Sequence, residues 1–414
     1  MAETQGPKIP RDKTNDYTHA SAALRREFIR QRTGAELSHV AKYSFDPSIL
    51  QGNIENFIGV AQVPIGVAGP LRINGEHAQG DFFIPLATTE GALVASYNRG
   101  MRLLTECGGV KTTVVEQYMQ RSPVFIFQDA ARARAFGVWI DQNFAAIQEK
   151  AEATTRIGKL LKIQQFSFGP LRHLRFNYAT GDAAGQNMVG KATLGACEWI
   201  AKSYPGGARW VLSGNMDTDK KYSRINMLLT RGKRVVAEAV IRKEILKDLM
   251  GVDTKELFEV RQISTTGAFL AGSANNGGHA PNGLTAMFIA TGQDVADISE
   301  SQAAVTYSQL LDNGDYYWSV TLTSLIVGTH GGGTGLPTQK ECLEMLDCRG
   351  QGKADKFAEI CAGVALAGET SLSSAVLHGD WVPSHDRLGR HHPEVGDSAL
   401  HQRHATQGKG PDSL

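Results

Sequence analysis

The sequence has 414 residues, of which 42% are hydrophobic and 21% are charged. This length and composition are typical of a soluble globular protein with two or three domains, and they exclude a largely disordered chain. Lysine and arginine number 43 against 42 aspartates and glutamates, so no overall field attracts nucleic acid or an anionic membrane.

The cysteines and the N-terminus indicate the compartment. The five cysteines form no CxxC pair and have no accompanying histidine pattern, which argues against a disulfide framework or structural zinc. Residues 2–16 are polar, and no segment approaches the ~20 apolar residues of a membrane span. We therefore expect a cytoplasmic, soluble protein with no metal site and with no nucleic-acid or membrane partner.

The first part of the chain predicts mixed helix and strand. Residues 1–58 are expected to form a small helical N-terminal region around the charged segment 21–32. Glycines and prolines then alternate with short β-branched runs over residues 59–83. Residues 91–104 predict a helix, because four apolar residues fall on one helical face: Leu93, Tyr97, Met101 and Leu104.

The pattern changes between residues 122 and 212, where short strand-like and helix-like segments alternate. They lie at residues 124–127, 130–157, 164–178, 187–202 and 209–212. This βαβαβ-like alternation predicts a compact α+β insert.

A larger domain, residues 59–121 and 213–388, is expected to surround this insert. Its second part is predicted to contain a strand and two helices, at residues 235–241, 281–298 and 354–377. Residues 389–414 are polar, and we expect them to form a disordered tail.

One carboxylate, Glu90, lies in an otherwise uncharged segment, residues 84–96 (IPLATTEGALVAS). Desolvation raises the pKa of a carboxyl group, so a glutamate held this way keeps its proton near neutral pH and can act as a general acid. The alternative is an exposed glutamate near a helix start, favoured by the helix dipole. The segment alone leaves both interpretations open.

Three further segments carry an isolated ionisable group among small or apolar residues. They are residues 213–221 (SGNMDTDKK), 290–294 (ATGQD) and 382–385 (VPSH). Each has a simpler interpretation by itself: a surface turn around Lys220, a paired carboxylate at a helix end for Asp294, and a surface histidine for His385. With Glu90 they supply a proton donor, a cation, a second carboxylate and a histidine.

No GxGxxG or GxxxxGK[ST] sequence occurs, so neither a Rossmann fold nor a P-loop is supported. Residues 181–188 (GDAAGQNM) could nevertheless bring a backbone turn and a helix start close to phosphate. The alternative is a turn that only caps a helix.

Taken together and in this order, these segments resemble the 3-hydroxy-3-methylglutaryl-coenzyme A reductase family. The resemblance runs from about residue 55 to residue 385 and includes three more motifs, at residues 55–59 (ENFIG), 65–71 (IGVAGPL) and 328–334 (GTHGGGT). It implies an α+β fold: a large mixed substrate domain, an inserted ferredoxin-like dinucleotide-binding domain at residues 122–212, and a helical N-terminal region. It also implies a homo-oligomer whose active site lies between subunits.

The resemblance assigns catalytic roles to four residues. Lys220 would stabilise the negative charge that develops on the thioester carbonyl and later on the aldehyde. Glu90 would donate a proton, Asp294 would tune both Lys220 and Glu90, and His385 would protonate the departing coenzyme A thiolate. The expected reaction reduces 3-hydroxy-3-methylglutaryl-coenzyme A to mevalonate and coenzyme A with two NADPH.

The remaining carried-over residues would bind the cofactor and the substrate. Thr155 and Arg156 match the position at which NADP-using members bind the 2′-phosphate, although a solvated basic helix face is the alternative. The other cofactor residues are Asp182, Gly185, Gln186, Asn187 and Met188. The substrate residues are Arg121, Ser213, Asp219, Lys221, Asn282, Asn98, Arg99 and His279.

The chain departs from the family pattern at two places. It has Arg261 and Gln262 where the family has a Lys-Asn pair, with the lysine contacting the substrate carboxylate, and it has His330 where a small aliphatic residue is commoner. Arg261 would either replace that lysine or mark a different acyl group. Two other functions therefore stay open: the same chemistry on another coenzyme A or carrier thioester, and a catalytically silent regulatory or binding protein of this fold.

Overall fold

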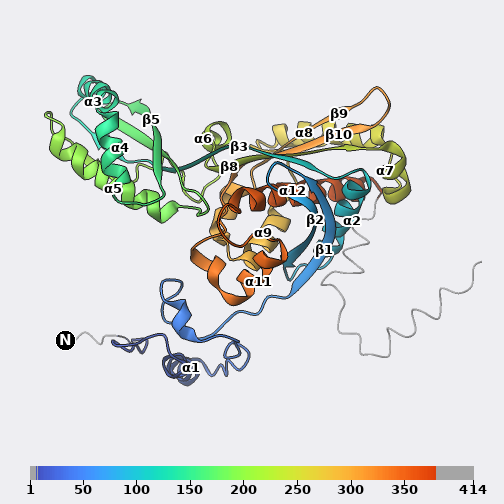
Figure 1. Cartoon of the computed structure of the whole chain (residues 1–414), viewed down its shortest axis with the longest axis horizontal. Coiled ribbons are helices and arrows are strands. Elements are labelled where there is room, and N and C mark those ends of the chain that lie inside the picture. The colour runs from blue at the N-terminus through green and yellow to red at the C-terminus, as the bar shows by residue number, and fades with distance from the viewer. Residues whose placement is uncertain (1–5, 7, 379–414) are drawn as a thin grey trace, which may run out of the picture.

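The computed structural model describes residue 6 and residues 8–378. These residues form a mixed helix and sheet structure, which confirms the expected α+β class. In Figure 1 the N-terminal helix α1, the helices α3, α4 and α5, and the larger body around α9 and α12 occupy three separate parts of the molecule.

The secondary structure comprises helices distributed along the whole described chain and strands in two sheets. The helices are α1 (His19–Thr33), α2 (Leu93–Glu106), α3 (Ala130–Gln142), α4 (Phe144–Glu152), α5 (Gln186–Ser203), α6 (Arg224–Leu229), α7 (Lys243–Met250), α8 (Thr254–Leu270), α9 (Ala280–Thr291), α10 (Ile298–Ser301), α11 (Pro337–Met345) and α12 (Ala354–His378), with the 3-10 segments η1 (Pro47–Leu50), η2 (Val295–Asp297) and η3 (Gly332–Gly335). The strands are β1 (Ile65–Asn74), β2 (Gln79–Ala87), β3 (Lys111–Arg121), β4 (Val124–Ile126), β5 (Lys159–Phe168), β6 (Leu171–Ala179), β7 (Arg209–Val211), β8 (Gly232–Ile241), β9 (Ala304–Leu310) and β10 (Tyr316–Leu325).

The larger sheet joins the insert to the body through one strand. Its order is β7-β4-β6-β3-β8-β10-β9, with β5 paired to β6, whereas β1 and β2 form a separate hairpin. The first part of β3 pairs with β8, and its last three residues, Met119 to Arg121, pair with β6. Figure 1 shows β3 running from the body toward the insert.

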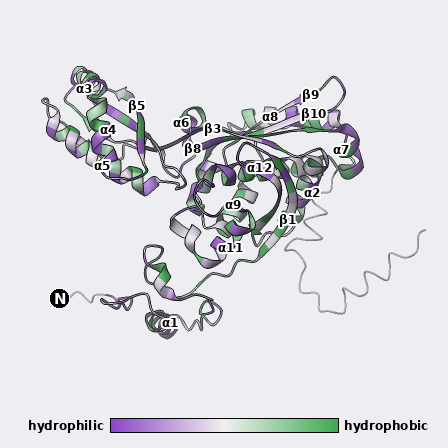
Figure 2. Ribbon diagram, viewed as in Figure 1, coloured by the Kyte–Doolittle hydropathy of each residue, from purple (hydrophilic) through white to green (hydrophobic). Residues whose placement is uncertain are grey.

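The buried apolar residues form two large clusters, one in the body and one in the insert. The body cluster includes Leu93, Tyr97, Met101 and Leu104, which confirms the predicted face of α2. In the insert, α5 carries both hydrophobic and hydrophilic residues along its length (Figure 2), as expected for a helix with one buried face.

Helix α12 corrects one expectation about apolar segments. The segment Ala354–Leu377 is long and apolar enough to cross a membrane, but 83% of its apolar stretch is buried inside the protein. Small residues such as Gly363 and Gly368 let β1 and α2 approach the helix closely, since a Cβ at Gly368 would lie 2.6 Å from the Tyr97 ring. The segment is therefore a core helix of the body.

Three predicted elements have different boundaries in the structure. The helix expected at residues 130–157 divides at Asn143 into α3 and α4. The strand expected at residues 164–178 is a hairpin of β5 and β6, which turns at Gly169 with a φ of 56°. The helix expected at residues 281–298 ends at Thr291, because Gly292 takes a left-handed C-cap with a φ of 74°. The expected tail, residues 389–414, lies outside the described residues.

The N-terminal region has its own small core and contacts the body. Ala22, Leu50 and Phe57 form this core, and Leu336 from the body packs against it. Asn53 donates a hydrogen bond of 3.0 Å to the carbonyl of Gly332. The region thus reaches the glycine-rich segment around η3.

Candidate active site

Lys220 lies on the loop between β7 and α6, in a left-handed backbone conformation with a φ of 55°. Asn215 and Thr218 on the same loop are also left-handed, which is unfavourable for residues other than glycine and indicates a strained loop. The Lys220 Nζ lies 2.7 Å from Asp294 Oδ2, and the hydrogen bond to Asp294 raises the pKa of Lys220. The structure therefore brings together two of the four predicted catalytic residues.

Asp294 reaches Lys220 from a segment that follows α9. It caps the short 3-10 segment η2, where its Oδ1 accepts a hydrogen bond of 3.0 Å from the Ala296 amide. Because α9 ends at Thr291, Asp294 lies beyond the helix and not in the helical run that the sequence suggested.

A network of buried charges supports the Lys220 loop. Arg231 is fully buried and donates to Asp219 Oδ1 at 2.6 Å, and its Nε lies 3.0 Å from Glu300 Oε2. Arg121 donates to the buried Asp217 at 3.1 Å and lies 3.7 Å from Asp219. The sequence predicted Arg121 and Asp219 as substrate residues. In the structure Arg121 forms ion pairs with Asp217 and Asp219, and Asp219 also pairs with Arg231.

Two carboxylates that the sequence did not indicate complete this network. One oxygen from each of Asp219, Asp297 and Glu300 lies within 4.8 Å of the others. Burial raises the pKa of Asp297 to about 6, and it raises the pKa of Glu300 to about 7 against the opposing effect of Arg231. The backbone amide of Lys220 also donates a hydrogen bond to Glu300.

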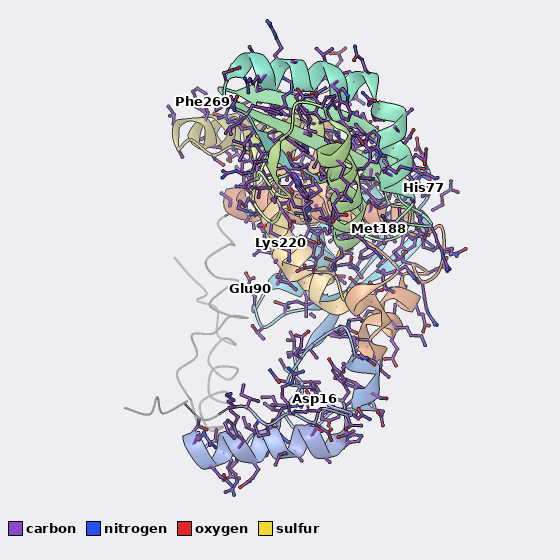
Figure 3. The ribbon with its side chains drawn as sticks, turned by 90° about the vertical axis from the view of Figure 1, so that its left-hand side faces the viewer. Asp16, His77, Glu90, Met188, Lys220 and Phe269 are labelled. Atoms are coloured by element: carbon purple, nitrogen blue, oxygen red, sulfur yellow. The ribbon has the colours of Figure 1, made fainter. Side chains whose placement is uncertain are left out.

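Glu90 lies in the turn between β2 and α2 and is half-buried. Its two carboxylate oxygens each accept from Asn282 Nδ2 at 3.3 Å, so the structure joins two of the predicted residues. Within the described part of the chain, no hydrogen bond or ion pair connects Glu90 to Lys220 or Asp294. Figure 3 shows the labelled Glu90 and Lys220 at different heights of the molecule.

A second group of predicted residues surrounds the start of α9 and the C-terminal half of α12. Arg99 donates to Ser371 Oγ at 3.2 Å, and His279 Nε2 lies 3.4 Å from Ser96 Oγ. The buried Glu369 on α12 accepts from the Gly278, His279 and Ala280 amides and so fixes the start of α9. Asn98 accepts from the Gly69 amide at 2.9 Å.

The predicted dinucleotide turn precedes α5. Gly185 has a φ of 86° and provides no side-chain cap, so the first amides of α5 stay available for an anion. Asp182 accepts hydrogen bonds from the Gly352 and Ala354 amides at the start of α12. It therefore caps a helix, as the alternative interpretation of this turn expected, but the helix is α12 and not α5. Gln186 donates to Asp219 and Asp297 at 3.1 and 2.9 Å.

This turn packs against the glycine-rich segment, and both line a groove of about 1460 Å³. The Thr329 amide donates to the Asp182 carbonyl at 2.9 Å, and a Cβ at Gly328 would lie 2.7 Å from the Ala184 nitrogen. The groove is also lined by Asn187, Met188, His330 and Asp294. It is large enough for a nucleotide, and Asp294, the partner of Lys220, lies on its wall.

The loop with Thr155 and Arg156 contacts the same turn. A Cβ at Gly181 would lie 3.1 Å from Ile157 Cγ2, and one at Gly158 would lie 3.4 Å from Met188 Sδ. Thr155 Oγ1 accepts from the Gly158 amide at 3.0 Å, which orders the loop, and Arg156 is exposed. An exposed guanidinium at this place can bind a phosphate group.

The other predicted residues have less informative positions. Ser213 and Lys221 are exposed, and Lys221 donates to the Asp219 carbonyl at 3.0 Å. Arg261 is buried, and its guanidinium donates to the Asn276 carbonyl and to Thr306 Oγ1. His385 lies outside the described residues.

Comparison with known proteins covers almost the whole chain. The family profile described as Hydroxymethylglutaryl-coenzyme A reductase matches residues 21–390. The 3-hydroxy-3-methylglutaryl-coenzyme A reductase of Pyrococcus abyssi is 45% identical over 384 residues, which cover 91% of this chain and 94% of that protein. The enzyme of the same name from Methanocaldococcus jannaschii is 43% identical and covers 89% of this chain and 92% of that protein.

A solved structure shares the fold. It is the class II 3-hydroxy-3-methylglutaryl-CoA reductase from Streptococcus pneumoniae bound to NADPH in open conformations. Its TM-score is 0.65 at 19% sequence identity, and the match covers 80% of this chain and 89% of that chain.

Proposed function

This chain belongs to the hydroxymethylglutaryl-coenzyme A reductase family, and we propose that it reduces 3-hydroxy-3-methylglutaryl-coenzyme A to mevalonate and coenzyme A with two NADPH. The observation that carries the proposal is the Lys220–Asp294 pair, in which Lys220 stands on a strained loop and Asp294 lines the same groove as the dinucleotide turn. A cation fixed there can stabilise an oxyanion that develops beside a bound nicotinamide.

The chain has the groups that an NADPH site requires. The uncapped start of α5 offers backbone amides to the pyrophosphate, and the exposed Arg156 offers a guanidinium to the 2′-phosphate. NADPH, when bound, supplies the hydride for each reduction. We propose that Thr155, Asp182, Gly185, Asn187 and Met188 shape this site around those two groups.

The side chains of the protein would then stabilise the developing negative charge and donate the protons that the reaction needs. Lys220, held by Asp294, stabilises the oxygen of the thioester carbonyl in the first reduction and of the aldehyde in the second. Glu90, oriented by Asn282, donates the proton to the alcohol that forms, and His385 protonates the coenzyme A thiolate that leaves. Arg99, Asn98, His279, Ser213, Lys221, Arg121 and Asp219 are proposed to position the substrate.

We further propose a homo-oligomer whose active site combines Glu90 of one subunit with Lys220 of another. Two observations support this: Glu90 and Lys220 belong to separate hydrogen-bonded groups, and α8 exposes large apolar side chains. Phe269 and Leu270 are 80% and 78% exposed, which is unusual for a monomer surface. We also propose the domain division given above and a cytoplasmic, soluble location.

The direct test is NADPH oxidation with 3-hydroxy-3-methylglutaryl-coenzyme A. We expect mevalonate as product and two cofactors consumed per thioester. No oxidation with any thioester would favour the silent binding protein instead.

The burial of Arg261 favours a second candidate, the same chemistry on another acyl thioester. Because Arg261 is bonded to Asn276 and Thr306, we propose that it does not replace the family's lysine at the substrate carboxylate. A panel of acyl thioesters distinguishes the candidates: faster consumption of a thioester without that carboxylate would support the second.

A further inference from the structure

Lys220 is held at both ends by one short segment of the chain. Asp294 precedes η2 and pairs with Lys220 Nζ, whereas Glu300 lies within α10 and accepts a hydrogen bond from the Lys220 backbone amide. The left-handed backbone of Lys220 is unfavourable by itself, so these contacts hold the loop in place. The position of Lys220 therefore depends on this segment.

The middle carboxylate of the segment contacts the dinucleotide turn instead. Asp297 lies between Asp294 and Glu300 at a spacing of three residues, and its Oδ1 accepts from Gln186 Nε2 at 2.9 Å. The same Nε2 donates to Oδ1 of Asp219, the residue that precedes Lys220, at 3.1 Å. The side chain of Gln186, the first residue of α5, thus connects the Asp294–Glu300 segment with the Lys220 loop.

Asp297 depends strongly on this one contact. Its side chain is almost fully buried, with 1% exposure, and Gln186 is the only hydrogen-bond donor to its carboxylate among residues 8–378. A buried carboxylate that loses its donor is costly, so the segment and Gln186 will tend to move together. The Asp219 carboxylate depends less on Gln186, because Arg231 also donates a hydrogen bond to it at 2.6 Å.

The dinucleotide turn cannot shift independently of Gln186. Gly185 is left-handed, and a Cβ there would lie 2.4 Å from Thr180 Cγ2, so the turn is tightly packed just before Gln186. The next two residues, Asn187 and Met188, line the groove. A ligand that binds the start of α5 therefore acts on the residue that contacts Asp297.

We infer that Gln186 and Asp297 are positioning residues that couple binding of the dinucleotide to the placement of Lys220. The inference rests on the proposed function of this site. In this arrangement an occupied dinucleotide turn orders the Lys220 loop, and an empty one leaves it less constrained. Lys220 is then best placed to stabilise an oxyanion when the hydride donor is present.

Hydrogen exchange on the full-length protein tests the coupling without turnover. We expect saturating NADPH to slow exchange of the amides in residues 214–221 of the wild type, and to do so much less in Gln186→Leu. Gln142→Leu, an exposed glutamine on α3 in the same insert, is the matched control and should respond like the wild type. NADPH fluorescence confirms that each protein is saturated.

Turnover gives the second measurement. We expect Gln186→Leu to lower kcat about tenfold or more while the KM for NADPH changes less than about threefold, since the loss is one of geometry at Lys220. Gln186→Leu combined with Asp297→Ala should lose little more than the worse single variant, because both remove one contact. Asp297→Asn keeps an acceptor oxygen and should retain more of kcat than Asp297→Ala.

Three outcomes would overturn the coupling. They are equal NADPH-dependent protection of residues 214–221 in wild type and Gln186→Leu, no such protection in the wild type, and fully multiplicative losses in the double variant. Saturable NADPH binding without any thioester reduction would reject the proposed function alone, since the exchange measurement does not require turnover.

Discussion

Lys220 Nζ and Asp294 Oδ2 lie 2.7 Å apart, although the two side chains are 42% and 46% exposed. Exposed ion pairs typically contribute less than about 1 kcal/mol to folding. The hydrogen bond that Lys220 donates to Asp294 nevertheless raises the pKa of Lys220 and fixes the direction of its ammonium group. The pair should therefore matter far more to the chemistry than to stability.

Asp294→Asn tests this separation. We expect kcat to fall about tenfold or more because the ammonium group loses its orientation, and the free energy of unfolding to change by less than about 1 kcal/mol. Steady-state kinetics and urea denaturation measure the two quantities. Asp248→Asn, an exposed site on α7, should alter neither. A large loss of stability in Asp294→Asn would show that the pair serves the fold instead.

Arg156→Ala tests the cofactor site. The exposed guanidinium faces no acidic partner among the described residues, and its proposed ligand is a phosphate that only NADPH carries. We expect the KM for NADPH to rise at least about tenfold while the KM for NADH changes little. Lys191→Ala, on the exposed face of α5, serves as the control. Equal effects on both cofactors would remove Arg156 from the 2′-phosphate site.

Mixing two inactive variants tests the site between subunits. Glu90→Gln and Lys220→Ala should each lose at least about 99% of activity. A heterodimer of the two, purified through different tags, would contain one site with both residues intact and should recover about half of the wild-type activity. A heterodimer as inactive as its parents would place Glu90 and Lys220 in the same subunit's site.

Asp297 should make stability depend on pH. Burial raises the pKa of Asp297 in the folded protein to about 6, from 3.8 for the free side chain. The stabilisation that the protonated side chain provides is therefore complete below pH 3.8, and it is lost as the pH rises through about 6. Asp297→Asn lacks this titration. The free energy of unfolding of the variant relative to wild type should therefore increase by about 2 kcal/mol between about pH 4.5 and about pH 7. A pH-independent difference in urea denaturation would contradict the assignment.

The motif containing Lys220 was recognisable in the sequence because its charged residues follow a run of small ones, and the structure does place Lys220 against Asp294. The buried charges behind it were not recognisable. Arg231 is followed by Lys233 and Arg234 and resembles an exposed basic turn, and Glu300 lies between two serines. Their burial depends on contacts between segments that are distant in the chain, and no local pattern records such contacts.

The predicted boundaries of helices and strands were wrong where a glycine that marks a turn lies within or beside a run of apolar residues. Gly169 and Pro170 mark the hairpin of β5 and β6, and Gly292 marks the end of α9. Reading these glycines as turns would have placed Asp294 outside the helix. The amphipathic face of α2, by contrast, was predicted correctly because its period of apolar residues is unambiguous.

The shared strand β3 limits how the insert can move relative to the body. Its residues 111–118 pair with β8 and residues 119–121 pair with β6, so the two halves meet in the middle of a strand and not at a flexible linker. A rigid rotation of the insert would have to twist or break backbone hydrogen bonds near Met119. The insert should therefore respond to a ligand bound to it by small adjustments passed along the backbone, and transplanting it into another member of the family would require matching the register of this one strand.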